Sequence, residues 1–185
     1  MDTWVWIAIA AVAAVVVVAL IAAASTRSRR RAHLRERFGP EYDRAVSSAD
    51  SRRAAERELA AREERRDRLD VRPLSAAARE RYREEWGAIQ ARFVDDPEGA
   101  VRQADSLLVR VLDERGYEVD DDPERRAADV SVDHPEVVER YRHGHAMLKA
   151  TGGDDGTENL RRAMVDFRAV FEELLEEEEE RAVTA

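Results

Sequence analysis

The sequence has no cysteine, a single lysine and few aromatic residues, and each shortage narrows what the chain can be. Without cysteine, disulfides, thiolate catalysis and cysteine-based zinc sites are all excluded. Apart from Lys149, all of the basic side chains are arginines. Aromatic residues make up 6% of the 185 residues, whereas charged residues make up 38%. A chain of this length has room for one modest core and an appendage.

Charged residues are also missing from one long stretch, residues 4–24, which reads "WVWIAIAAVAAVVVVALIAAA". At about 1.5 Å per residue, a helix of this length spans roughly 30 Å, the thickness of the hydrocarbon core of a bilayer. The stretch predicts a transmembrane anchor over residues 1–26. A cleaved signal peptide is the alternative, because "IAAAS" resembles a small-residue cleavage site. The basic n-region of a signal peptide is missing, however, and the run is longer than a typical h-region.

Arginines flank only the C-terminal end of this apolar stretch. The positive-inside bias therefore predicts a single-pass protein of the cell membrane whose C-terminal part is cytoplasmic. Trp4 and Trp6 are expected at the opposite membrane interface. Small residues four apart within the span favour helix pairing, so a homodimer is an alternative to a monomer. The arginines predicted to contact lipid headgroups are Arg27, Arg29, Arg30, Arg31, Arg35 and Arg37.

The charge of the remaining chain changes sign along its length. Residues 25–69 carry a net charge of +5, and residues 70–185 carry −13. A helix is predicted to run out to Phe38 and to break at Gly39-Pro40. Residues 41–69 are rich in helix formers but lack a continuous apolar stripe. Residues 27–69 are therefore predicted to form a basic juxtamembrane helix and a polar, solvated stalk.

Beyond the linker "DVRPLS", the apolar residues recur with the period of a helix. The pattern predicts four amphipathic helices within residues 76–94, 98–117, 136–153 and 158–182, with Gly116 as a C-terminal cap. Short connections between such helices favour a small bundle. The fold class expected from the sequence is all-α: a transmembrane helix, a polar stalk and an acidic helical bundle domain over residues 70–185.

The tetrapeptide "DDPE" occurs at 95–98 and again at 121–124. An aspartate before a proline and a glutamate is typical of a helix start, since the aspartate caps, proline fits the first turn and glutamate lies near the positive end of the helix dipole. Pro40-Glu41 and Pro135-Glu136 follow the same pattern. A calcium loop is excluded at the second copy, because Arg125 stands where glycine is required and Ser131 where a bidentate glutamate is required.

The histidines do not form a recognisable metal site. His143 and His145 are two residues apart, so on a helix they point about 200° apart and cannot share a metal. His145 lies on the apolar face, which predicts a core histidine. The alternative is an enzyme or ligand-binding bundle that uses His145 with Tyr141 and nearby carboxylates. We predict no catalytic residue, no metal and no cofactor. Nucleic-acid binding is not expected, because acidic residues are interleaved with the arginines and no aromatic platform accompanies them.

Four phrases, "RERFGPEYDRAV" (35–46), "DVRPLS", "RFVDDP" and "DVSVDHPEVVERY", carry a resemblance. Over residues 27–175 the chain resembles an uncharacterised family of short membrane-anchored proteins from high-GC Gram-positive bacteria. The resemblance implies the anchored architecture and no activity, and some members of that family are labelled secreted. The sequence thus predicts a non-enzymatic, membrane-anchored scaffold or adaptor that presents its bundle to an unidentified protein partner. A secreted helical protein released by signal cleavage remains an alternative.

Overall fold

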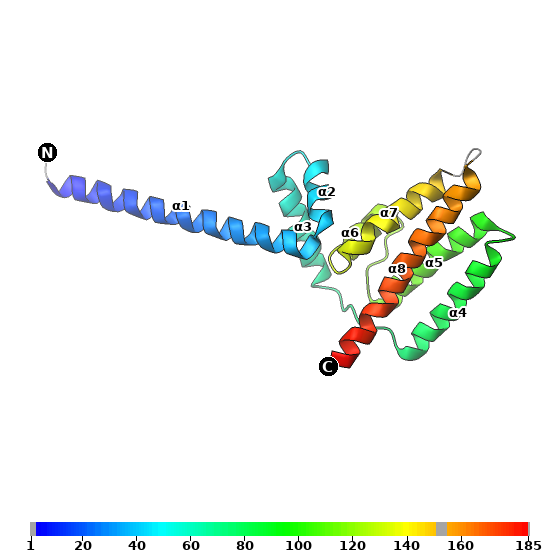
Figure 1. Ribbon diagram of the computed structural model, residues 1–185. Helices are drawn as coiled ribbons and strands as arrows, with labels where there is room; N and C mark the ends of the chain where they lie inside the picture. The colour runs from blue at the N-terminus through cyan, green and yellow to red at the C-terminus, as the bar shows by residue number, and fades with distance from the viewer. Residues whose placement is uncertain (1–2, 151–154, 185) are drawn as a thin grey trace.

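The computed structural model describes the backbone of residues 3–150 and 155–184, without the side chains of residues 3, 5–11, 13–14, 23 and 176–184. Within these bounds the fold is all-α, as predicted. The first helix projects as a rod, and the others gather around its C-terminal end (Figure 1). The helices are α1 (Thr3–Phe38), α2 (Pro40–Ser48), α3 (Arg52–Arg66), α4 (Ala76–Arg92), α5 (Pro97–Arg115), α6 (Pro123–Val130), α7 (Pro135–Lys149) and α8 (Gly156–Thr184).

Helix α1 runs through the predicted anchor and ends at Phe38, where the sequence predicts its end. Over the residues that the structure describes, no helix combines the length and the apolarity needed to cross a membrane. Several side chains of the predicted span, including that of Trp6, lie outside what the structure describes. Trp4 is described and is exposed. The membrane anchor therefore stays a prediction.

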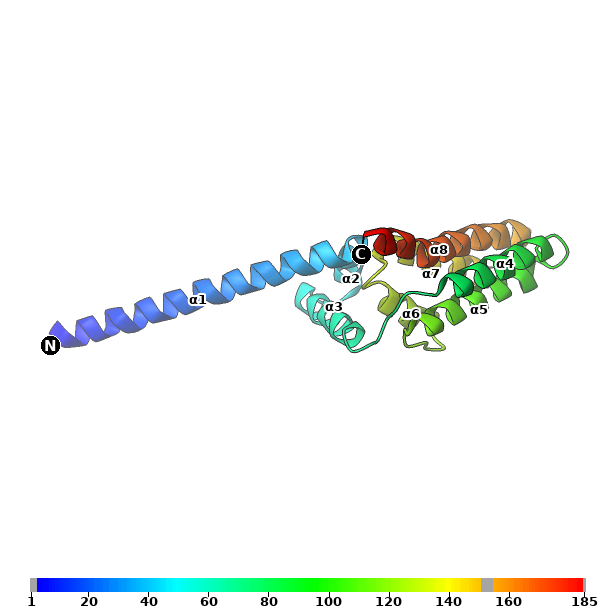
Figure 2. The same cartoon turned by 90° about the horizontal axis from the view of Figure 1, so that it is seen from below.

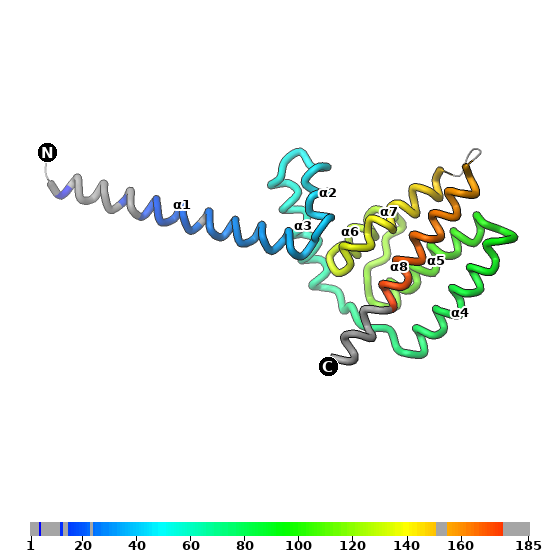
Figure 3. The backbone as a smooth tube through the Cα atoms, viewed as in Figure 1, coloured from blue at the N-terminus to red at the C-terminus, as the bar shows by residue number. Residues whose placement is uncertain are grey.

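Residues 40–66 differ from the predicted solvated stalk. The chain turns at Gly39, whose φ of 46° suits glycine, and then forms α2 and α3, which pack against each other and against the end of α1 (Figure 3). Ser51 caps α3 by accepting a hydrogen bond from the backbone N–H of Ala54. Each helix contributes only a few apolar residues, which explains why no stripe is visible in the sequence. They form a small core of Leu34, Phe38, Tyr42, Ala45, Ala55, Leu59 and Val132.

The larger core lies among the five remaining helices, α4 to α8. Helix α8 packs against both α7 and α5, and α5 also packs against α4. These long helices run alongside one another in both views (Figures 1 and 2). The ring of Trp86 on α4 stacks on Phe171 of α8, with 4.8 Å between the ring centroids. The apolar stripes predicted from the sequence supply this core, and the predicted helical bundle is confirmed.

The Pro-Glu pairs mark helix starts, as predicted. Helices α2, α5, α6 and α7 each have a proline in their first turn. Asp96 accepts a hydrogen bond from the N–H of Gly99, and Asp122 accepts one from the N–H of Glu124, each over 3.0 Å. At the other end of α5, Gly116 has a φ of 93° and closes the helix, as predicted. Both DDPE copies are therefore capping sequences.

Candidate functional site

Buried charges gather where the α2–α3 pair meets α7. Glu41 is 2% exposed, and its carboxylate is held by arginines from two other helices. Oε1 accepts hydrogen bonds from Nη1 of Arg62 at 2.8 Å and from Nη2 of Arg142 at 2.9 Å. Oε2 accepts from Nη1 of Arg142 at 2.7 Å. One carboxylate thus joins α2, α3 and α7, and Arg142 binds it in the bidentate manner that guanidinium geometry favours.

A second layer of carboxylates surrounds this cluster. Oε1 of Glu124, in the first turn of α6, accepts from Nε of Arg142 at 2.9 Å and from Nη1 of Arg44 at 3.2 Å. Glu58 accepts from Nη2 of Arg62, which lies one turn further along α3. Arg62, which is buried, and Arg142, which is largely covered, each contact a more exposed carboxylate in addition to Glu41. We call Glu41, Arg62, Arg142 and Glu124 the junction cluster.

Local sequence and long-range contacts both act on Glu41. The residue lies in the first turn of α2, where the helix dipole favours a negative charge. Burial by itself raises the pKa of the Glu41 carboxyl, but the hydrogen bonds and positive charges of Arg142 and Arg62 outweigh it and lower the pKa below its ordinary value. With both oxygens engaged by arginine donors, Glu41 is a fixed anion and is not placed to act as a general base.

Asp133, just before α7, forms a second contact point between the same parts of the chain. Its carboxylate accepts from Nε of Arg66 at 2.6 Å, from the hydroxyl of Tyr117 at 2.7 Å and from Nη2 of Arg37 at 3.3 Å. Burial first, and then the charge of Asp133, raise the pKa of the Tyr117 hydroxyl, which therefore stays a donor. Asp133 connects the last turn of α1 and the end of α3 to the bundle.

The structure divides the six arginines that the sequence assigns to lipid headgroups into two groups. Arg31 lies 3.4 Å from Glu56, Arg35 lies 3.5 Å from Asp43, and Arg37 contacts Asp133. Among the described residues, no carboxylate lies within 4.0 Å of the three arginines nearest the apolar stretch, which are Arg27, Arg29 and Arg30. These three are the better placed of the six to meet an external anion.

His145 is buried within the bundle. Its Nε2 lies 3.0 Å from Oδ1 of Asp105, and its ring contacts Tyr141 and Phe167 edge-on. The hydroxyl of Tyr141 accepts from Nε of Arg126 at 2.8 Å. Four hollows on the surface of the described part of the chain are lined by other residues, and His145 lines none of these four. These contacts are those of a histidine packed in a core.

His134 is also buried, at the residue before α7, but its side chain does not cap that helix. Nη1 of Arg115 lies 3.2 Å from its Nε2, and a guanidinium can only donate, so Nε2 must be the acceptor. The ring proton is therefore on Nδ1, which lies 3.7 Å from a carboxylate oxygen of Glu173. Nowhere among the described residues do three or more histidine, aspartate or glutamate side chains form a group that could hold a metal ion.

The junction cluster could not be predicted from the sequence. Glu41 is visible there only as half of a Pro-Glu helix start, and its bidentate partner Arg142 lies 101 residues further along the chain. No motif surrounds Arg142 that would set it apart from the other arginines of the chain. Burial of Glu41 and the partial burial of Arg142 set the pair apart, and both depend on how α2 meets α7.

Comparisons with known proteins do not identify this chain. No family model, no curated protein and no solved structure matches it. The resemblance to membrane-anchored proteins of high-GC Gram-positive bacteria therefore stays a prediction from the quoted phrases.

Proposed function

We propose that this protein is a non-enzymatic, membrane-anchored scaffold or adaptor that holds a helical body at a fixed position beside the inner membrane face. One observation carries the proposal: α1 continues unbroken from the apolar stretch into the folded body. Its residues Leu34 and Phe38 are buried in the small core, and Arg37 contacts Asp133. A helix fixed in this way transmits its position to the body, whereas a flexible linker would not.

The length of α1 sets the spacing. From Ser25 to Phe38 the helix rises about 20 Å, at roughly 1.5 Å per residue. Arg35 and Arg37 then lie more than a Debye length, about 10 Å at 0.1 M salt, from a membrane surface at Ala24. The headgroup contacts on α1 are accordingly assigned to Arg27, Arg29 and Arg30, while the bundle of α4 to α8 stands clear of the lipid.

The bundle surface is the proposed binding face for a protein partner. Residues 70–185 carry a net charge of −13, which favours a basic partner. Val94 and Val165 are large apolar side chains that are 84% and 51% exposed. The proposal of no enzymatic activity is supported by the packing of His145 and by the engagement of Glu41 with two arginines.

Cysteine labelling of intact cells tests the membrane topology, because the chain has no cysteine of its own. Thr3→Cys places one thiol before the apolar stretch, and Glu98→Cys places one on the exposed start of α5. A membrane-impermeant maleimide should label Thr3→Cys in intact cells and Glu98→Cys only after lysis. Labelling of Glu98→Cys in intact cells would reverse the proposed orientation.

The secreted alternative has its own test. Mass spectrometry of the native N-terminus should find the apolar stretch retained in the membrane fraction. Mature chains in the medium that begin near Ser25 would contradict the anchor and favour release by signal cleavage.

A further inference from the structure

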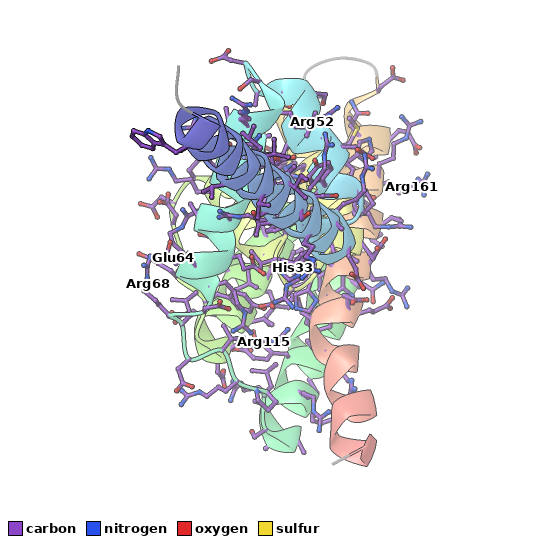
Figure 4. The ribbon with its side chains drawn as sticks, turned by 90° about the vertical axis from the view of Figure 1, so that its left-hand side faces the viewer. His33, Arg52, Glu64, Arg68, Arg115 and Arg161 are labelled. Atoms are coloured by element: carbon purple, nitrogen blue, oxygen red, sulfur yellow. The ribbon has the colours of Figure 1, made fainter. Side chains whose placement is uncertain are left out.

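Two hollows open side by side between α1 and the start of α3. Their volumes are about 400 and 520 Å³, and Arg27, Arg53 and Glu56 line both. Figure 4 looks along α1 from its N-terminal end and labels Arg52 on the neighbouring cyan segment. We call the pair of hollows the basic groove. Its charged residues are Arg27, Arg30, Arg31, Arg52, Arg53, Arg57 and Glu56.

Most positive charges of the basic groove have no carboxylate partner among the residues that the structure describes. Glu56 is its only carboxylate among the described residues, and Arg31 lies 3.4 Å from it. For the other five arginines no carboxylate lies within 4.0 Å in the part of the chain that the structure describes. Arg57 makes one further contact, a hydrogen bond from its Nε to the carbonyl oxygen of Arg53. Like charges held close together repel one another unless an anion separates them.

The groove also lies at the level of the predicted membrane surface. Ala24 and Thr26, the last residues around the apolar stretch, line its two hollows. The N-terminal end of α3, where the helix dipole is positive, supplies Arg52 and Arg53 to the lining of the groove. Planar guanidinium groups match the paired oxygens of a phosphate.

We propose that the basic groove binds the phosphate of an anionic lipid headgroup, clamped between α1 and α3. This inference rests on the proposed membrane anchoring, which brings headgroups to the groove. It adds Arg52, Arg53 and Arg57 to the residues that contact lipid. A nucleic acid is the less suitable ligand, because no aromatic side chain lines either hollow to stack on bases.

Titration calorimetry of the purified chain in neutral detergent tests the proposal. The probes are short-chain phosphatidylglycerol, short-chain phosphatidylcholine, inorganic phosphate and a single-stranded oligonucleotide. Phosphatidylglycerol should bind more tightly than the other three, and its binding should weaken as salt is raised. The variant Arg52→Gln/Arg53→Gln/Arg57→Gln should bind it on the order of a hundredfold more weakly, at about fivefold per arginine.

A matched control removes the same charge elsewhere. Arg92→Gln/Arg102→Gln/Arg168→Gln alters exposed arginines on α4, α5 and α8 and should leave the affinity within about threefold, since distant charges are screened. If circular dichroism shows that the α3 variant is unfolded, Arg27→Gln/Arg30→Gln on α1 replaces it, with Arg92→Gln/Arg102→Gln as its control. A loss of roughly 25-fold from the groove pair, at about fivefold per arginine, and a loss of less than about threefold from the control pair support the proposal.

Several outcomes would overturn the inference. These are equal binding of phosphatidylglycerol and phosphatidylcholine, equal losses in the groove and control variants, or tighter binding of inorganic phosphate or the oligonucleotide. None of these results depends on whether the chain spans a membrane, because the calorimetry is done in detergent. Failure of the groove is thus distinguishable from failure of the anchor, which the cysteine labelling addresses separately.

Discussion

The carboxylate of Glu41 is buried and balances the positive charges of two arginines, Arg62 and Arg142, from distant parts of the chain. Burying Glu41 and Arg62 and partly burying Arg142 costs solvation free energy, and only good geometry with further hydrogen bonds offsets this cost. Arg62 and Arg142 have both, through Glu41 itself and through Glu58 and Glu124. We therefore expect the cluster to contribute mainly specificity, by favouring one arrangement of α2, α3 and α7.

Removing the central charge should destabilise the fold strongly. Glu41→Gln leaves the guanidinium groups of Arg62 and Arg142 without their shared buried anion, and the free energy of unfolding should fall by about 3–5 kcal/mol. Glu64→Gln is the control, because Glu64 is exposed and lies 3.6 Å from an exposed arginine, and it should cost less than about 0.5 kcal/mol. Urea denaturation of both variants measures the difference. Equal, small effects would contradict the assignment of Glu41 as a buried anion.

The lowered pKa of Glu41 predicts that the stability of the fold depends on pH. Because the pKa of Glu41 is lower in the folded chain than its ordinary value of 4.5, the unfolded chain takes up the proton first as the pH falls. The contribution of Glu41 to stability is then fully present above about pH 4.5 and is lost as the pH falls through the folded pKa. The stability difference between the native chain and Glu41→Gln should be constant above pH 4.5 and shrink below it. A difference that grows on acidification would refute this sign.

Among the helices, α7 and α8 pack closely because Gly144 has no side chain. A Cβ atom at that position would lie 2.6 Å from Cε1 of Phe167, a fully buried ring of α8 that has no room to move. At Gly87 on α4, by contrast, an added Cβ atom would meet no other atom within 4 Å. The two glycines therefore respond differently to the same substitution.

Gly144→Ala should destabilise the chain by about 1–3 kcal/mol through overpacking. Gly87→Ala should stabilise it by roughly 0.5–1 kcal/mol, because alanine loses less backbone entropy in a helix. Thermal or urea unfolding of the two variants under one set of conditions provides the comparison. If both variants were stabilised, α7 and α8 would not pack as closely as the structure has them.

The helices themselves are accessible to sequence reasoning because their signals are local. Proline in the first turn, an aspartate cap and the glycine at 116 each act within a few residues of the helix end. The apolar stripes of α4, α5, α7 and α8 repeat with the helical period and point to a common core. By contrast, the sequence predicts a stalk where α2 and α3 form, since their small core draws on α1, α2, α3 and Val132 together.

For the molecule as a whole, we expect the contacts of Glu41 and Asp133 to hold α1 and the bundle together as one rigid unit. Both carboxylates connect the N-terminal helices to the bundle through arginines on α1, α3 and α7. The proposed role as a scaffold depends on that rigidity, because it fixes the distance from the apolar stretch to the bundle surface.

Distance measurements between spin labels test this rigidity. Cysteines introduced at Arg29 on α1 and Arg102 on α5 report the separation of the two parts, and the native background should give a narrow distribution. Adding Glu41→Gln and Asp133→Asn should broaden it by releasing the α2–α3 pair from α7. Adding Glu64→Gln should leave it narrow. A broad distribution in the native background would count against the scaffold proposal.

The sequence by itself determined the helical class, the helix boundaries marked by proline and glycine, and the apolar stretch followed by arginines, because each depends on neighbours a few residues apart. Only the tertiary structure decided that Glu41 is buried, that α2 and α3 fold back onto α1, and that Arg52, Arg53 and Arg57 join Arg27 and Arg30. Contacts between residues far apart in the chain leave no periodic pattern, and burial of a charge depends on which surfaces finally meet.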